Sequence, residues 1–101
     1  MMNFAIASVL SLFASAPAHA EIAKVPAACY TNARKAAVEQ VLTSYPGESA
    51  FDRNTDFARR ADDGAIYIVV WVKRQSQEFA EAVYVYVHGD GLKCVIDFVN
   101  Y

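Results

Sequence analysis

This sequence lacks a large excess of either positive or negative charge. Nine lysine and arginine residues stand against eleven aspartate and glutamate residues, which leaves a net charge of −2. The charges are mixed in sign along the chain and form no basic block. Because a nucleic-acid-binding surface needs a basic patch or stripe, we expect no nucleic-acid partner. A basic amphipathic segment of the kind that lies on anionic membranes is missing too.

Recognisable catalytic motifs are also missing. The chain contains no G-x-S-x-G, no glycine-rich phosphate loop and no zinc signature. After removal of the N-terminal segment described in the next paragraph, His88 is the one histidine that remains. A catalytic zinc needs three protein ligands, so His88 alone is not enough. We therefore predict no catalytic residue, no metal and no cofactor. A small hydrolytic or metal-dependent enzyme built on His88 stays as an alternative, although we expect Asp97 to lie far along the hairpin from it.

Long hydrophobic runs occur at one place, the N-terminus. An apolar run over residues 4–16 is followed by Pro17 and by Ala18-His19-Ala20, a pattern typical of a cleaved signal peptide. The run is too short to span a bilayer, which takes about 20 residues. We predict a signal peptide at residues 1–20 and one mature domain at 21–101, periplasmic or secreted from a bacterium, with no membrane insertion after cleavage. No lysine or arginine precedes the run, and a buried N-terminal helix is the alternative.

Cysteine is scarce, and both copies lie in the predicted mature chain, at Cys29 and Cys94. Paired cysteines in an exported protein usually form a disulfide, and no Cys-x-x-Cys suggests redox chemistry. We predict a structural disulfide between the two. It would close a long loop and stabilise the fold by about 4 kcal/mol in the chain-entropy model.

Periodicity predicts an α+β fold in which one N-terminal helix packs on a three- to four-stranded antiparallel meander. Residues 26–44 have helical spacing and end at Tyr45-Pro46-Gly47, and residues 65–74 and 81–101 alternate as strands. Residues 46–65 form either a polar edge strand or an irregular loop. The predicted buried arc of the helix is mostly alanine and consists of Cys29, Tyr30, Ala33, Ala36, Ala37 and Val41.

Strand registers follow from matching the β-branched faces, because a slip of one residue would send core side chains outward. A predicted turn at Gly89-Asp90 places Leu92, Cys94, Ile96 and Phe98 on the helix side. The opposite face then carries three predicted rows: Tyr67, Tyr86 and Lys93; Val69, Tyr84 and Val95; and Trp71, Ala82 and Asp97.

This opposite face is unusually apolar for a sheet surface in water, which normally alternates to polar residues. We interpret it as the binding surface of a small, non-enzymatic, exported binding or inhibitory protein. Its partner would be a protein, a peptide or a glycan of the cell envelope. One alternative is a homodimer that buries this face, and another is aromatic packing that only stabilises the sheet. The predicted contact residues are Tyr67, Trp71, Tyr84, Tyr86, Lys93, Asp97 and Tyr101.

Overall fold

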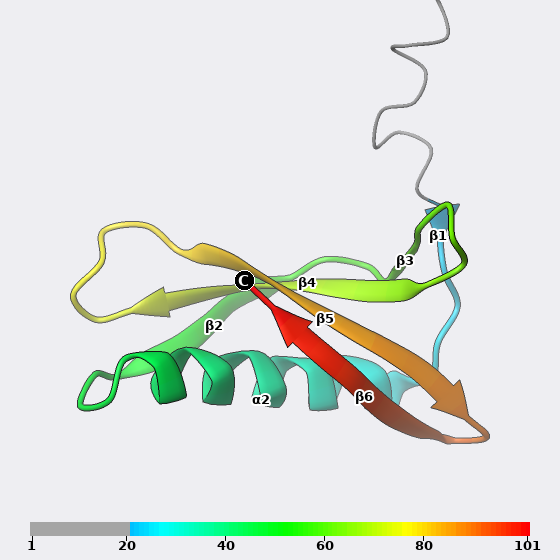
Figure 1. The fold of residues 1–101 in the computed structure, drawn as a ribbon, viewed down its shortest axis with the longest axis horizontal. Coiled ribbons are helices and arrows are strands. Elements are labelled where there is room, and N and C mark those ends of the chain that lie inside the picture. Colours follow the sequence, from blue (N-terminus) through cyan, green and yellow to red (C-terminus); the bar gives the residue numbers. More distant parts are fainter. Residues whose placement is uncertain (1–20) are drawn as a thin grey trace, which may run out of the picture.

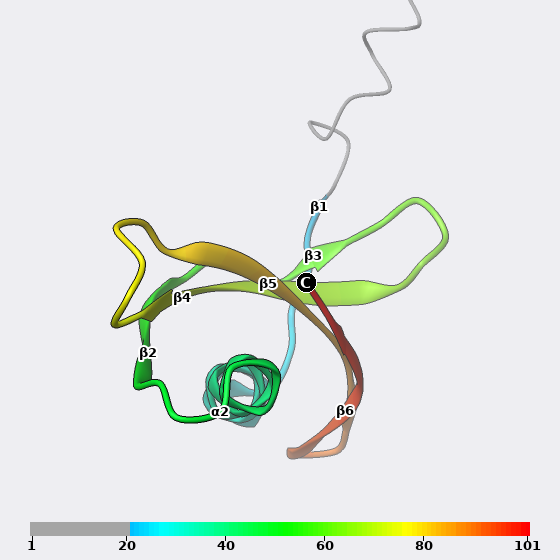
Figure 2. The same ribbon diagram turned by 60° about the vertical axis from the view of Figure 1, so that its left-hand side comes forward.

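One helix lies against one side of a curved antiparallel sheet in the computed structural model (Figures 1 and 2), which describes residues 21–101. The predicted signal peptide, residues 1–20, lies outside the described residues. The α+β prediction is confirmed. The elements in chain order are β1 (Glu21–Ile22), α2 (Ala27–Ser44), β2 (Ala50–Thr55), β3 (Arg59–Arg60), β4 (Ile66–Arg74), β5 (Glu81–Asp90) and β6 (Lys93–Asn100).

Helix α2 forms where the sequence predicts it. Pro26 precedes its first turn, a position where the missing proline N–H costs nothing. After the last turn, the Tyr45 N–H donates to the Val41 carbonyl oxygen at 3.0 Å, and Gly47 has a φ of 91°. The buried side repeats every fourth residue, at Cys29, Ala33, Ala37 and Val41. Because three of its side chains are so small, the sheet supplies most of the core volume.

The sheet has the order β1-β3-β4-β5-β6, and β2 also pairs with β4. Of the two alternatives left open for residues 46–65, the edge strand is the one observed, as two strands, β2 and β3, which pair with opposite halves of β4. The predicted register of β4 on β5 is confirmed, since Ile68 lies opposite Val85 and Val70 lies opposite Val83. Figure 2 shows α2 end-on inside the concave side of the sheet, so the convex side faces away from the helix.

The core lies between the helix and the concave side of the sheet. Alternate residues of β4 and β5 are buried there, and apart from Arg74 at the end of β4 these are all β-branched, which suits a pleated packed surface. The buried sheet residues are Ile68, Val70, Val72, Val83, Val85 and Val87.

The predicted register of β5 on β6 is wrong. The two turn residues are Gly91 and Leu92, with Gly91 at a φ of 69°, instead of Gly89 and Asp90. Strand β6 also bulges at Asp97, because Val87 pairs with Ile96 while the preceding Tyr86 pairs with Phe98.

The new turn position and the bulge together change where several side chains of residues 92–100 lie. Leu92, predicted in the core, is 91% exposed at the turn. Phe98 lies opposite Tyr86 on the convex side, and Val99 takes the place in the core that Phe98 was expected to fill. The predicted rows that joined Lys93 to Tyr86, Val95 to Tyr84 and Asp97 to Ala82 do not form.

Gly89 of β5 lies close to Pro26, the residue that precedes α2. A Cβ on Gly89 would lie 3.0 Å from Cδ of Pro26, so only glycine fits here without movement of the proline ring. A turn at Gly89 would end β5 before this contact. The close approach brings the first turn of α2 to the beginning of β6.

The predicted disulfide is confirmed. Cys29 in α2 is bonded to Cys94 in β6, with a Cα–Cα distance of 5.0 Å and a sequence separation of 65. Such a bond indicates an oxidising environment. Within residues 21–101, no helix is long and apolar enough to cross a membrane.

Candidate binding surface

Four aromatic rings contact one another across the convex side of the sheet. The ring centroids of Tyr84 and Tyr67 are 5.9 Å apart, those of Tyr67 and Tyr86 are 5.8 Å apart, and those of Tyr86 and Phe98 are 4.4 Å apart. The last pair is stacked, with an interplanar angle of 11°. We call Tyr84, Tyr67, Tyr86 and Phe98 the aromatic row.

Strand pairing builds this row. Tyr67 lies directly opposite Tyr86, and Tyr86 lies directly opposite Phe98, so three neighbouring strands each supply a ring at one level. The two outer rings remain open to solvent, because Phe98 is 55% exposed and Tyr84 is 40% exposed. The two outer rings therefore keep exposed surface after the four rings have packed on one another.

Trp71 lies on the same side of the sheet but outside the aromatic row. It is opposite Ala82 in β5 and Asn54 in β2, and its indole Nε1–H donates to Oδ2 of Asp56 at 3.3 Å. Strand β2 thus lies beside β4 at the edge of the sheet, and Asp56, just after β2, accepts the hydrogen bond from the indole N–H of Trp71.

The structure does not bring Lys93 and Tyr101 to the aromatic row. Lys93 pairs with Asp90 next to the turn. Tyr101 lies at the other end of the sheet, where it lines a pocket of about 640 Å³ with Tyr45 and Glu81. Phe98 belongs to the aromatic row but was not among the predicted contact residues, because a regular strand would have placed it in the core.

His88 and Asp97 form a pair, contrary to the expected separation. The Nδ1 atom of His88 is 2.9 Å from Oδ1 and 3.1 Å from Oδ2 of Asp97. Two features cause this contact: the turn at Gly91-Leu92 moves β6 along β5, and the bulge projects Asp97 toward His88. A carboxylate that accepts from Nδ1–H leaves Nε2 as the ring nitrogen for a ligand or a proton.

A pocket of about 320 Å³ contains this pair. Tyr86 and Phe98 also line it, so the pocket continues the aromatic row, and Arg60 and Ile66 close it from β3 and β4. Its described lining residues include no serine, threonine or cysteine, so the phenol of Tyr86 is the one hydroxyl group that they bring to the pocket. Among residues 21–101, no group of three or more His, Cys, Asp or Glu side chains could hold a metal ion.

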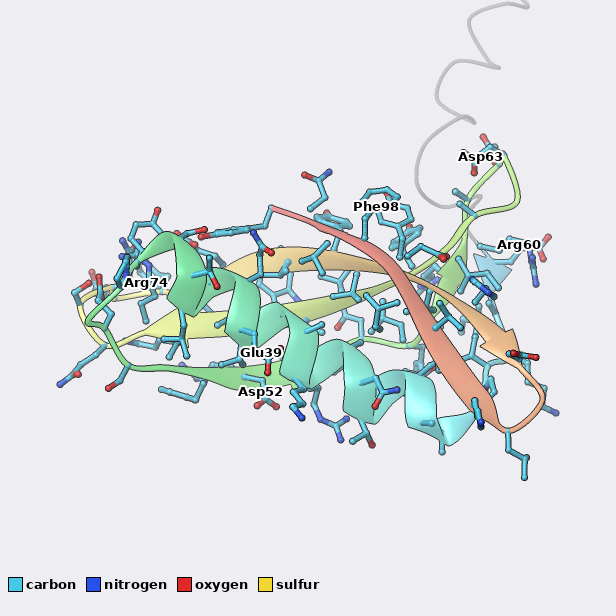
Figure 3. The ribbon with its side chains drawn as sticks, turned by 60° about the horizontal axis from the view of Figure 1, so that its bottom comes forward. Glu39, Asp52, Arg60, Asp63, Arg74 and Phe98 are labelled. Atoms are coloured by element: carbon cyan, nitrogen blue, oxygen red, sulfur yellow. A yellow bond between two sulfur atoms is a disulfide. The ribbon has the colours of Figure 1, made fainter. Side chains whose placement is uncertain are left out.

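A buried charge cluster lies at the opposite end of the sheet from Arg60 (Figure 3). The Arg74 side chain is 7% exposed, and its guanidinium contacts Oε2 of Glu48 at 2.9 Å and Oε2 of Glu81 at 3.6 Å. It also lies 3.6 Å from the ring centroid of Tyr45. This cluster joins the segment after α2 to the ends of β4 and β5.

Hydrogen bonds set the ionisation of this cluster. The Ser76 hydroxyl and Arg74 both donate to the Glu48 carboxylate, and these bonds lower its pKa below the usual 4.5 although partial burial opposes them. Burial is the largest single effect and disfavours the charge on Arg74, but the bond to Glu48 and the electrostatic attraction of Tyr45, Glu48 and Glu81 together outweigh it and raise the pKa of Arg74. The sequence carried a signal for this site, since Arg74 has the same strand parity as Ile68, Val70 and Val72 and so continues their core face.

Comparison with protein-family models, with curated proteins and with solved structures finds no match to this chain. Function is therefore inferred from the geometry of the chain itself.

Proposed function

We propose that the mature chain is a small exported binding or inhibitory protein of the bacterial envelope, periplasmic or secreted, and that it does not act as an enzyme. The aromatic row is its contact surface, and a protein, a peptide or a glycan of the envelope is its partner. The observation that carries this proposal is the continuous contact of four rings on the side of the sheet away from the helix.

Exposure supports a binding role beyond sheet stability. An aromatic pair contributes about 0.5–1.5 kcal/mol beyond its buried area, and it can do so in a closed core as well as on a surface. Here the rings at both ends of the row are open, and half-buried Val69 and Ala82 extend the apolar surface beside them. Contiguous exposed apolar patches of this kind tend to be interaction sites.

Export is supported by two separate features. The disulfide between Cys29 and Cys94 forms in oxidising compartments. The apolar run and the Ala18-His19-Ala20 triplet have the pattern of a cleaved signal peptide.

Capture from an envelope extract tests the proposal. The mature, oxidised protein is immobilised, and the Tyr84→Ser and Phe98→Ser variants are compared with it. We expect both variants to lose the captured partner, because each removes an exposed ring of the row. Phe79→Ser is the matched control, since Phe79 is 74% exposed in the loop between β4 and β5 and lies outside the row.

Unchanged capture by the two row variants would refute this contact surface. Light scattering on the same proteins tests the homodimer alternative. A dimer that dissociates on Tyr84→Ser substitution would mean that a second copy occupies the aromatic row.

The His88–Asp97 pair supports a second candidate function, acid–base catalysis in the pocket beside the row. In this case His88→Ala and Asp97→Asn would each abolish turnover in a screen of chromogenic esters, phosphodiesters and glycosides. Activity equal to that of the unaltered protein in both variants would remove this candidate.

A further inference from the structure

We infer that the pocket at the end of the aromatic row binds one ring of a saccharide, and that the row holds the neighbouring rings of an oligosaccharide. This inference rests on the proposed binding function and names the chemical class of the ligand.

The pocket has an apolar wall and a polar rim. The wall is the stacked pair of Tyr86 and Phe98, whose rings are 4.4 Å apart. The rim comes from three different strands, with Arg60 from β3, His88 from β5 and Asp97 from β6. Its volume of about 320 Å³ is at the small end of the range for ligand pockets.

Charge on the rim selects against simple ions. Arg60 would attract an anion, but the carboxylate of Asp97 lines the same pocket and would repel it. A cation would be attracted by Asp97 but repelled by Arg60. A neutral ligand with many hydroxyl groups avoids both, because a hydroxyl can donate to Asp97 and can also accept from Arg60.

His88 adds a further polar contact with a defined orientation. Its Nδ1 is held by both oxygens of Asp97 at 2.9 and 3.1 Å, so the imidazole ring is positioned by its neighbour. Nε2 is then the ring nitrogen that bonds a ligand hydroxyl. A sugar ring matches the whole pocket, since its C–H face packs on Phe98 while its hydroxyl groups reach the rim.

Continuity with the aromatic row predicts a dependence on chain length. Tyr86 belongs to both the pocket and the row, and Tyr67 and Tyr84 follow at centroid distances of 5.8 and 5.9 Å. Further sugar rings can therefore stack on the half-buried ring of Tyr67 and the exposed ring of Tyr84 as they leave the pocket. We expect a tetrasaccharide to bind about tenfold or more tightly than its monosaccharide.

Amide NMR titration of the mature, oxidised protein tests the inference. The probes are N-acetylglucosamine and its tetramer, with cellotetraose and maltotetraose as comparisons, at concentrations up to the millimolar range. We expect shifts at the amides of Ile66, His88 and Phe98, and an extension to Tyr67 and Tyr84 with at least one tetramer.

Three variants connect the shifts to the pocket. Phe98→Leu keeps an apolar side chain but removes the ring, so its affinity should fall about tenfold. Asp97→Asn should also weaken binding, because the amide no longer offers two acceptor oxygens. Phe79→Leu is the control and should bind as the unaltered protein does. Amide shifts distant from the substitution show that each variant is folded.

Absence of shifts with all four probes would overturn the saccharide inference, as would shifts that Phe98→Leu leaves unchanged. Partner capture separates this failure from that of the proposed function. If no saccharide binds but a protein is captured through Tyr84, only the saccharide inference fails. If capture is also independent of the row, both fail.

Discussion

Arg74 shows how one residue on the buried side of a strand shapes its surroundings. A guanidinium that is 7% exposed would be costly without partners. Two carboxylates and the Tyr45 ring supply them, and the Glu48 carboxylate is held in turn by Ser76. The loops that follow α2 and β4 are thereby joined, although they are distant in sequence.

The Glu48 carboxylate should make stability depend on pH. Its folded-state pKa is below the usual 4.5, so the ionised form stabilises the fold above that pH, and the contribution is lost as pH falls through the folded pKa. We expect Glu48→Gln to lower the melting temperature at neutral pH, and the difference from the unaltered protein to shrink as the pH falls below 4.5.

Thermal unfolding followed by circular dichroism across this pH range is the measurement. Glu39→Gln, on the exposed side of α2, is the control and should melt with the unaltered protein near neutral pH. A Glu48→Gln difference that stays constant down to the lowest pH would contradict the assignment.

At the scale of elements, alternation predicted β4 and β5 correctly but failed for β6. Asp97 and Asn100 are an odd number of positions apart, so a regular strand would place one of these two polar side chains on the helix side. The bulge at Asp97 removes this conflict, since Asn100 then lies opposite Tyr84 on the convex side. This odd spacing was the available sign of a bulge, but it does not say where the extra residue lies.

The position of the β5–β6 hairpin turn could not be read from the sequence either, because two sites offer a suitable turn residue. His88-Gly89-Asp90-Gly91 contains two glycines, and either suits a tight turn. Local preference does not decide between them. In the structure Gly89 is a strand residue that pairs with Cys94 and approaches Pro26, and the turn forms at Gly91.

At the scale of the whole molecule, the disulfide is the main long-range restraint. It joins residues 65 positions apart and connects the first turn of the helix to the beginning of the last strand. A small domain has a total stability of about 5–15 kcal/mol, often at the lower end. A restraint worth about 4 kcal/mol therefore decides whether most molecules are folded.

Reduction of Cys29–Cys94 should lower the free energy of unfolding by about 4 kcal/mol. Urea unfolding with and without reductant measures this change, and the Cys29→Ser/Cys94→Ser double variant separates it from effects of the reductant. A loss below about 1 kcal/mol would mean that the loop is already restrained in the unfolded chain.

The sequence by itself determined the helix, the three long strands, the α+β class and the pairing of the cysteines. These features depend on local periodicity and on the presence of only two cysteines, and both can be read along the chain. Tertiary structure decided the site. Stacking of Phe98 on Tyr86 and the contact between His88 and Asp97 depend on one bulge and one turn, and the pairing of β3 with β4 places Arg60 beside them. A shift of a single residue moves every later side chain to the other side of the sheet, and packing against the helix selects among the registers.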